Sequence, residues 1–270
     1  MSGKYIMLIA VTVDVESDWG GRTNECYGIE YGLPSILQLL ESSGIKATFF
    51  ISGIIVSRYK EMIRKISESG HEVASHGFTH ANYGLLNKER LAEEINKSKQ
   101  LLENETGVEI LGFRTPQFRT NKELFDVLLD LHFRYDSSMA RATFPTRYSG
   151  LSVLNTPFLL ENGLLEIPVS SIPYFRIPLG LRWINLIGFA TFRSLLNKFT
   201  LPQPTVFYLH PFDLIQPPEN PKMSFSIKRW YSYKAQNAKR TLEQILNYWK
   251  ARGDEFVLLK EVFPQSKEAS

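Results

Sequence analysis

The sequence predicts an α/β fold, a distorted (β/α)7-type barrel built as a single domain over residues 1–270. Two observations lead to this prediction. Short apolar runs, typical of buried parallel strands, alternate with longer stretches that have the apolar spacing of helices. About seven such units follow one another, and barrels of this kind often reach this length as one domain.

The expected strands are short, apolar and rich in β-branched and aromatic residues. They cover residues 5–13, 47–51, 72–75, 108–113, 133–135, 164–169, 205–209 and 256–259. Because most of them are followed by a helical pattern, the strands should be parallel and joined by right-handed crossovers. The carboxyl ends of all these strands then open onto one face of the barrel.

The expected helices carry apolar residues three or four positions apart and several end at glycine. They cover residues 33–43, 54–69, 88–106, 122–131 and 227–252. Asn87 and Asn121 are good N-caps for two of them. Residues 172–199 are apolar, with Trp183 and four basic residues. This stretch favours a buried helix of the barrel wall, and the alternative is a basic amphipathic surface that touches an anionic membrane.

Composition limits the classes of binding partner and the cellular locations that we expect for this protein. The net charge is only +3 and there is no Lys/Arg run, so no nucleic-acid partner is expected. The single cysteine, Cys26, cannot form an internal disulfide. Residues 1–13 carry one basic residue and then an apolar run, which favours a buried first strand over a signal peptide. No segment reaches ~20 consecutive apolar residues. These features predict a cytoplasmic location, with peripheral membrane contact through 172–199 as the alternative.

Polar residues able to do chemistry follow the predicted strands. They are Asp14 and Glu16, His76 and His80, Arg114, and His210. Because the ends of parallel barrel strands share one face, these side chains should meet in space, where barrel active sites are assembled. We therefore predict a hydrolytic site at this end of the barrel.

The spacing suggests roles for some of these residues. Asp14 and Glu16 are two apart, so both point to one side of an extended strand. His76 and His80 are four apart, which brings both imidazoles to one face of a helical turn and suits one metal ion. Taken alone, the acids could be ordinary loop residues and the histidine spacing could be accidental. Two histidines and a carboxylate together form the ligand set of a hydrolytic zinc site.

The remaining two residues are weaker signals by themselves. An arginine that follows a strand, such as Arg114, is more often an ion-pair partner than a catalytic group. His210 ends an apolar strand and could form a structural hydrogen bond, but it is also well placed to act as a general acid or base.

Several segments resemble the polysaccharide deacetylases that share the NodB homology domain. Thr12-Val13-Asp14-Val15-Glu16 is similar to the first family motif, which normally reads Thr-Phe-Asp-Asp-Gly. Ser75-His76-Gly77-Phe78-Thr79-His80 resembles the second motif, Phe113-Arg114-Thr115-Pro116 the third and Leu209-His210-Pro211 the fifth. Lys46–Phe50, Tyr135–Ser138 and Glu166–Ser170 also resemble family segments, the last two being similar to the subgroup that opens with Asp-Val-Glu.

The resemblance implies an N-deacetylase of an amino sugar with one divalent metal, usually zinc. It implies that Asp14 is the catalytic base, that Arg114 holds this base, and that His210 is the general acid. His76 and His80 would bind the metal. Four further residues are expected to contact the carbohydrate substrate: Tyr83, Pro116, Asp136 and Trp183.

One position departs from the family pattern. Val15 stands where the usual second aspartate binds the metal, and valine cannot coordinate an ion. Glu16 is the expected substitute because its i, i+2 relation to Asp14 aims it at the same cavity. The alternative function is a metal-free hydrolase of a small cyclic amide, similar to allantoinases. A third possibility is a family member that binds carbohydrate without catalysis. Retention of the His-x-x-x-His pair favours the metal-dependent enzyme.

Overall fold

The computed structural model describes residues 6–21, 24–142, 153–217 and 224–262. Its main sheet is built from the strands β1 (Leu8–Val15), β2 (Thr48–Ile51), β3 (Glu72–Ser75), β4 (Gly112–Phe113), β5 (Tyr135–Asp136), β6 (Phe158–Leu159), β7 (Leu165–Glu166), β10 (Thr205–Leu209) and β11 (Glu255–Phe256). A separate hairpin is formed by β8 (Ser171–Ile172) and β9 (Ile177–Pro178). The expected start of β1 at Tyr5 lies outside the described residues.

The sheet is a strongly curved, mostly parallel barrel wall in the order β10-β1-β2-β3-β4-β5-β7-β6. Only β6 runs antiparallel, as a hairpin with β7, and β11 pairs with the start of β1. The gap between β7 and β10 is bridged by an irregular segment, in which Ser170 N–H donates to the Val206 carbonyl and Tyr208 N–H donates to that of Leu179. The expected distorted barrel is confirmed.

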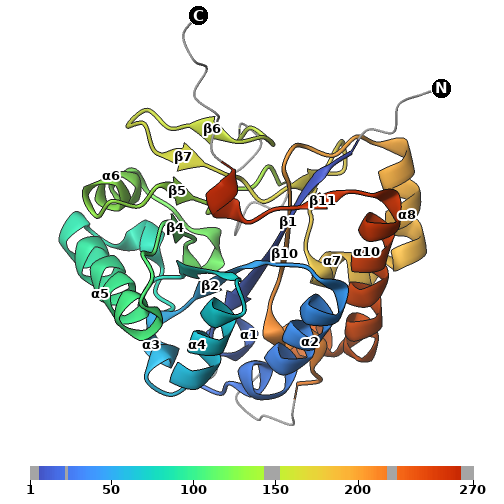
Figure 1. Ribbon diagram of the computed structural model, residues 1–270, viewed down its shortest axis with the longest axis horizontal. Helices are drawn as coiled ribbons and strands as arrows, with labels where there is room; N and C mark the ends of the chain where they lie inside the picture. The colour runs from blue at the N-terminus through green and yellow to red at the C-terminus, as the bar shows by residue number, and fades with distance from the viewer. Residues whose placement is uncertain (1–5, 22–23, 143–152, 218–223, 263–270) are drawn as a thin grey trace, which may run out of the picture.

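Within the described residues, helices α1 to α10 accompany the sheet, and those labelled in Figure 1 lie around it. They are α1 (Asp18–Gly21), α2 (Leu33–Ser43), α3 (Gly53–Val56), α4 (Lys60–Glu68), α5 (Lys88–Thr106), α6 (Lys122–Asp130), α7 (Leu181–Ile187), α8 (Phe189–Lys198), α9 (Phe225–Ser232) and α10 (Ala238–Arg252). Single turns occur at Gly28–Gly32, Tyr83–Leu85, Pro116–Phe118, Pro211–Leu214, Ala235–Asn237 and Leu259–Glu261. Asn87 and Asn121 cap α5 and α6 as predicted, each accepting a backbone N–H.

The long helix predicted over residues 227–252 is instead two helices. Lys234 has φ +56°, in the left-handed region, and this turn separates α9 from α10. Its ammonium group donates to the Leu186 carbonyl and its own carbonyl accepts from Asn185, so α7 holds the break in place. A local apolar pattern could not reveal this because the partners of the turn are 48 and 49 residues away.

The core occupies the space between the sheet and its helices. The outward side of β1 and β10, which faces the surrounding helices, contributes Ile9, Val11, Val13, Phe207 and Leu209 to the larger core cluster, and the Phe207 ring lies 5.5 Å from that of Trp249 on α10. A smaller cluster fills the barrel interior, with Phe50, Tyr135, Ile167, Val206 and Tyr208. The polar side chains of the candidate site lie at the carboxyl ends of the strands. A separate buried polar group lies at the amino end of β3, where Glu72 accepts from the Thr48 and Tyr135 hydroxyls.

Residues 172–199 are mainly barrel wall. Helices α7 and α8 bury Leu181, Ile184 and Phe192 in the core. Gly180 pairs in parallel with Tyr208, so the chain runs from β9 toward the site end of β10. The turn at residues 173–176 therefore lies at the opposite end of the barrel from His210. Among the described residues, no helix combines the length and apolarity needed to cross a bilayer.

Candidate active site

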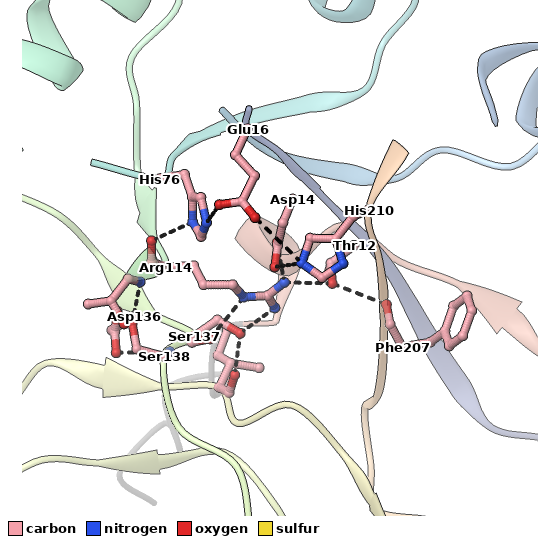
Figure 2. A network of polar contacts seen from close by, with 12 residues as sticks. Thr12, Asp14, Glu16, His76, Arg114, Asp136, Ser137, Ser138, Phe207 and His210 are labelled. Atoms are coloured by element: carbon pink, nitrogen blue, oxygen red, sulfur yellow. Dashed lines mark hydrogen bonds and ion pairs between the residues drawn. The ribbon is translucent and has the colours of Figure 1, made fainter. Parts of the chain in front are cut away.

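Strand β1 carries Asp14, and Glu16 directly follows the strand. β1 lies between β10 and β2, where Asp14 pairs in register with Phe50. Asp14 and Glu16 point to the same side, as their spacing predicts, and both are buried. Val15 turns the other way into the core. Figure 2 shows the two carboxylates between His76 on one side and His210 on the other.

The two histidines lie on a loop after β3. The predicted helical turn is wrong: residues 76–82 have no helical hydrogen bonds. Gly77 has φ +73°, and a Cβ there would overlap the Tyr83 hydroxyl, so glycine is required. Hydrogen bonds to residues outside the loop hold it in place instead. Gly53 N–H donates to the Gly77 carbonyl at 2.8 Å, and Phe78 N–H donates to the Tyr83 hydroxyl at 3.0 Å.

One carboxylate oxygen joins both histidines. Oε2 of Glu16 lies 3.2 Å from Nε2 of His76 and 2.7 Å from Nε2 of His80. Burial alone would raise the pKa of Glu16, but His80 and His76 together hold it well below its ordinary range. Glu16 is therefore an anion at neutral pH.

Some buried polar atoms of Glu16, His76 and His80 have no hydrogen-bond partner in the part of the chain that the structure describes. Nδ1 of His76 lies 2.8 Å from the Arg114 carbonyl oxygen, which can only accept, so Nδ1 carries the proton of the neutral ring. Nε2 then presents a lone pair to the Glu16 carboxylate, acceptor against acceptor. Oε2 of Glu16 and Nε2 of His80 are both buried and make no hydrogen bond among the described residues. A cation between them would satisfy all three atoms.

A divalent metal fits this donor set. Two imidazole nitrogens and a carboxylate are the ligands of catalytic zinc sites, which leave further positions open. A tetrahedral ion separates neighbouring donor atoms by about 3.3 Å, close to the Glu16–His76 distance and longer than the Glu16–His80 distance. Within the described ranges, no group of three or more His, Cys, Asp or Glu side chains has, as it stands, the geometry to hold a metal ion. Binding of an ion here would require Glu16 and His80 to separate.

The Asp14 carboxylate is fixed by Arg114. Nη1 of Arg114 donates to Oδ1 of Asp14 at 2.7 Å and to the Thr12 hydroxyl at 2.9 Å. The rest of the guanidinium donates to the carbonyl and hydroxyl oxygens of Ser137. With four of its five N–H donors occupied, Arg114 holds Oδ1 of Asp14 and leaves Oδ2 on the side of His210 (Figure 2).

His210 stands on the other side of Asp14. Its Nε2 lies 3.8 Å from Oδ2 of Asp14 and 4.0 Å from Oε1 of Glu16. Oδ2 of Asp213 accepts from the His210 backbone N–H at 2.9 Å and lies 3.3 Å from Nδ1. Burial would lower the pKa of His210, but Asp213, Asp14 and Glu16 outweigh it and raise that pKa to about 9. The ring is therefore set up to hold a proton at neutral pH.

The structure places the four expected substrate contacts differently. Tyr83 is buried behind the histidine loop, and its hydroxyl supports that loop. Pro116 begins the turn after β4 and is buried. Trp183 lies on α7 with its ring 5.4 Å from that of Trp230. A substrate contact by these residues stays a prediction.

Asp136 lies beneath Arg114, away from the cavity. Its carboxylate accepts from the Ser138 hydroxyl at 2.6 Å and backbone N–H at 3.0 Å. Burial raises the pKa of Asp136 and, together with the charge of Asp136, that of the neighbouring Glu166. Asp136 therefore holds Ser138 in place. The Ser138 hydroxyl in turn accepts from the backbone N–H of Thr115, the residue that follows Arg114.

Three site residues were not expected from the sequence. Asp213 orients His210, Gln117 lies 3.2 Å from Nδ1 of His80, and Glu94 on α5 holds the histidine loop. Asp213 follows His210 by three residues, a spacing that could have suggested it. Gln117 and Glu94 are 37 and 14 residues away from His80 in sequence and carry no local signal.

The geometry agrees with comparisons to known proteins. Residues 9–135 match the polysaccharide deacetylase family. This match includes five of the six proposed catalytic and metal-binding residues and excludes His210. The chain is 25% identical over 158 residues to a peptidoglycan deacetylase of Helicobacter pylori, covering 55% of this chain and 54% of that protein. The chain spans about half or less of the length of the first curated relatives it matches.

Two solved structures share the fold. Puue allantoinase aligns with a TM-score of 0.67 at 17% identity, covering 97% of this chain and 90% of its own. The Bc1960 peptidoglycan N-acetylglucosamine deacetylase aligns with a TM-score of 0.60 at 16% identity, covering 96% and 89%. At this identity the likeness concerns the fold. The family expected from the sequence is supported, while an Asp-Val-Glu subgroup stays a prediction.

Proposed function

We propose that this protein is a metal-dependent hydrolase that removes an N-acyl group, in the first instance N-acetyl, from an amino sugar of a polysaccharide, oligosaccharide or lipid-linked glycan. The observation that carries the proposal is the meeting of Glu16 with His76 and His80, where Oε2 of Glu16 and Nε2 of His80 are buried without a hydrogen-bond partner among the described residues. The polysaccharide deacetylase match and the deacetylase named among the relatives support this reaction class.

The metal site would consist of Glu16, His76 and His80, with zinc the expected ion. When bound, such an ion lowers the pKa of a coordinated water and polarises the amide carbonyl. Asp14 Oδ2, held in place through Arg114, accepts the proton of the attacking water.

His210 completes the reaction on the opposite side of Asp14. It donates a proton to the departing amine, which is otherwise too basic to leave. Asp213 keeps its ring in position by accepting from the His210 backbone and facing Nδ1, so Nε2 is the proton-donating atom. The 3.8 Å between Nε2 and Asp14 Oδ2 supports the proposal that these two groups act as acid and base on one substrate amide.

Metal content and acetate release test the proposal. The purified protein should contain about one divalent metal per chain and release acetate from N-acetylchitooligosaccharides. Asp14→Asn should retain the metal and lose at least 10²-fold in kcat, in keeping with the contribution of general base catalysis. Glu16→Gln should lose the metal. An Asp14→Asn protein with near-normal activity would contradict the assigned role.

The alternative is a metal-free hydrolase of a small cyclic amide. The likeness to an allantoinase concerns the fold alone. A metal-free enzyme would not need the histidine pair that faces Glu16, so we consider a metal-free hydrolase the weaker alternative. It predicts a metal-free protein that hydrolyses allantoin, and the same metal analysis separates the two.

A further inference from the structure

Helix α9 presents an apolar and basic face to solvent beside the site. The exposed residues on this face are Phe225, Ser226, Arg229, Trp230 and Tyr233, which follow one another at helical spacing. Phe225 is 79% exposed, Trp230 40% and Tyr233 52%. The outward face of a helix on a globular protein is ordinarily polar, so three exposed aromatic rings in one stripe indicate a binding surface.

The segment of sequence that contains this stripe carries charge of one sign. Residues 224–242 contain five basic residues and no acidic residue: Lys228, Arg229, Lys234, Lys239 and Arg240. Arg229, Lys239 and Arg240 are exposed. None of the five forms an ion pair with a carboxylate of the described residues. Basic residues interleaved with Trp, Tyr and Phe are the composition of interfacial helices that bind anionic bilayers.

The inner face of α9 is connected to the catalytic histidine by stacked rings. Tyr231 lies 5.8 Å from Phe212 and 5.3 Å from Trp19, measured between ring centroids. Phe212 in turn stacks on His210, with centroids 4.6 Å apart and planes at 14°. Helix α9 therefore packs against the same loop that carries His210. A ligand bound to the outer face of α9 would lie next to this loop.

We infer that α9, with its stripe of Phe225, Arg229, Trp230 and Tyr233, docks the protein on an anionic phospholipid surface. The aromatic rings would lie at the headgroup level, and the unpaired cations would face the lipid phosphates. On the proposed function, on which this step rests, the substrate is an N-acylated amino sugar held at the membrane by a lipid. This surface differs from residues 173–176, whose exposed Tyr174 lies at the far end of the barrel.

Vesicle co-sedimentation in about 0.15 M salt tests the inference. The probes are phosphatidylcholine vesicles with and without phosphatidylglycerol. The wild type should sediment with the anionic vesicles and much less with the neutral ones. Phe225→Ser combined with Arg229→Glu should lower partitioning at least about tenfold, because it removes an exposed ring that would enter the headgroup layer and reverses one charge. Each single change should give an intermediate loss.

Two matched variants serve as controls. Tyr174→Ser removes an even more exposed ring, at 84%, from the opposite end of the barrel, and Lys122→Glu reverses an exposed charge on α6. Both should sediment like the wild type. Loss with Tyr174→Ser instead of the α9 variant would move the contact to the other end and overturn the inference. Retention on insoluble chitin that depends on Phe225, without vesicle binding, would identify a carbohydrate platform and overturn it as well.

Activity measurements separate this inference from the proposed function. The α9 variant should release acetate from soluble N-acetylchitooligosaccharides at the wild-type rate, since Phe225 and Arg229 are outside the site. A wild type that is active on these sugars but does not sediment refutes the docking surface and leaves the proposed function intact. A wild type that sediments with the anionic vesicles, yet contains no metal and releases no acetate, refutes the proposed function and leaves the docking surface intact.

Discussion

Arg114 and Asp14 form an ion pair of 2.7 Å in which both side chains are almost fully buried, at 0% and 1% exposure. Removing the cation leaves a buried anion without compensation, which typically costs about 3–5 kcal/mol. We therefore expect Arg114→Met to lower the free energy of unfolding by about this amount and to abolish activity. Chemical denaturation measures the first effect and acetate release the second.

The exposed pair between Arg58 and Glu30, also 2.7 Å long, is the matched control. Water screens it, so Arg58→Met should cost only about 0–1 kcal/mol. Equal losses for the two variants would mean that burial does not govern the Arg114 pair.

Asp213 is expected to govern the rate of the proposed reaction. Its carboxylate accepts from the His210 backbone N–H and faces Nδ1. An amide in its place cannot stabilise a protonated ring, so Asp213→Asn should lower kcat about 10²-fold with little change in KM. Metal content should stay at the wild-type level. A loss confined to KM would assign Asp213 to substrate binding instead.

Glu94 is expected to set metal affinity from a distance. Its Oε2 accepts from the Thr79 backbone N–H at 2.9 Å and the Thr79 hydroxyl at 2.6 Å, just before His80. Glu94→Gln weakens this anchor and should reduce zinc affinity about 10-fold, within the range found for residues that orient metal ligands. Chelator competition gives the value.

The neighbouring Glu93 provides the control for that experiment. It is exposed and pairs only with Arg90 among the described residues. Glu93→Gln should bind zinc like the wild type. If both variants bind zinc equally well, the Glu94 anchor has no part in forming the site.

His71 is expected to make the protein sensitive to acid. Burial, helped by Lys46, lowers its pKa from 6.5 to about 4, and Nδ1 accepts the Ala47 N–H. Between pH 6.5 and 4 the unfolded chain binds a proton that the folded protein does not. The stability contributed by His71 is therefore complete above pH 6.5 and is lost as the pH falls toward 4, by about 3 kcal/mol.

Replacement of His71 removes this linkage. His71→Asn should flatten the pH dependence of the unfolding free energy over that window, as measured by denaturant titrations at several pH values. His132, which is exposed, is the control, and His132→Asn should keep the wild-type slope. An unchanged slope in His71→Asn would assign the acid sensitivity to other groups.

Strand and helix positions could be read from the sequence wherever local pattern and burial agree. The bounds Leu33–Ser43, Glu72–Ser75, Lys88–Thr106 and Thr205–Leu209 match the predicted ranges. In each, apolar residues repeat at one period and a glycine, cap or strand end sets the limit. The meeting of Asp14, His76, Arg114 and His210 followed as well, because parallel strands must end on a common face.

Other features depended on contacts between distant parts of the chain. A helical turn suits two histidines four apart, yet residues 76–80 form a loop because Tyr83, Gly53 and Glu94 take up its backbone groups. Asp136 looks like a site residue in sequence and is buried under Arg114 in the structure. The sequence by itself determined which side chains reach the carboxyl ends of the strands. Only the tertiary structure decided which of them meet around Asp14 and Glu16, since hydrogen-bond partners up to about a hundred residues apart orient each one.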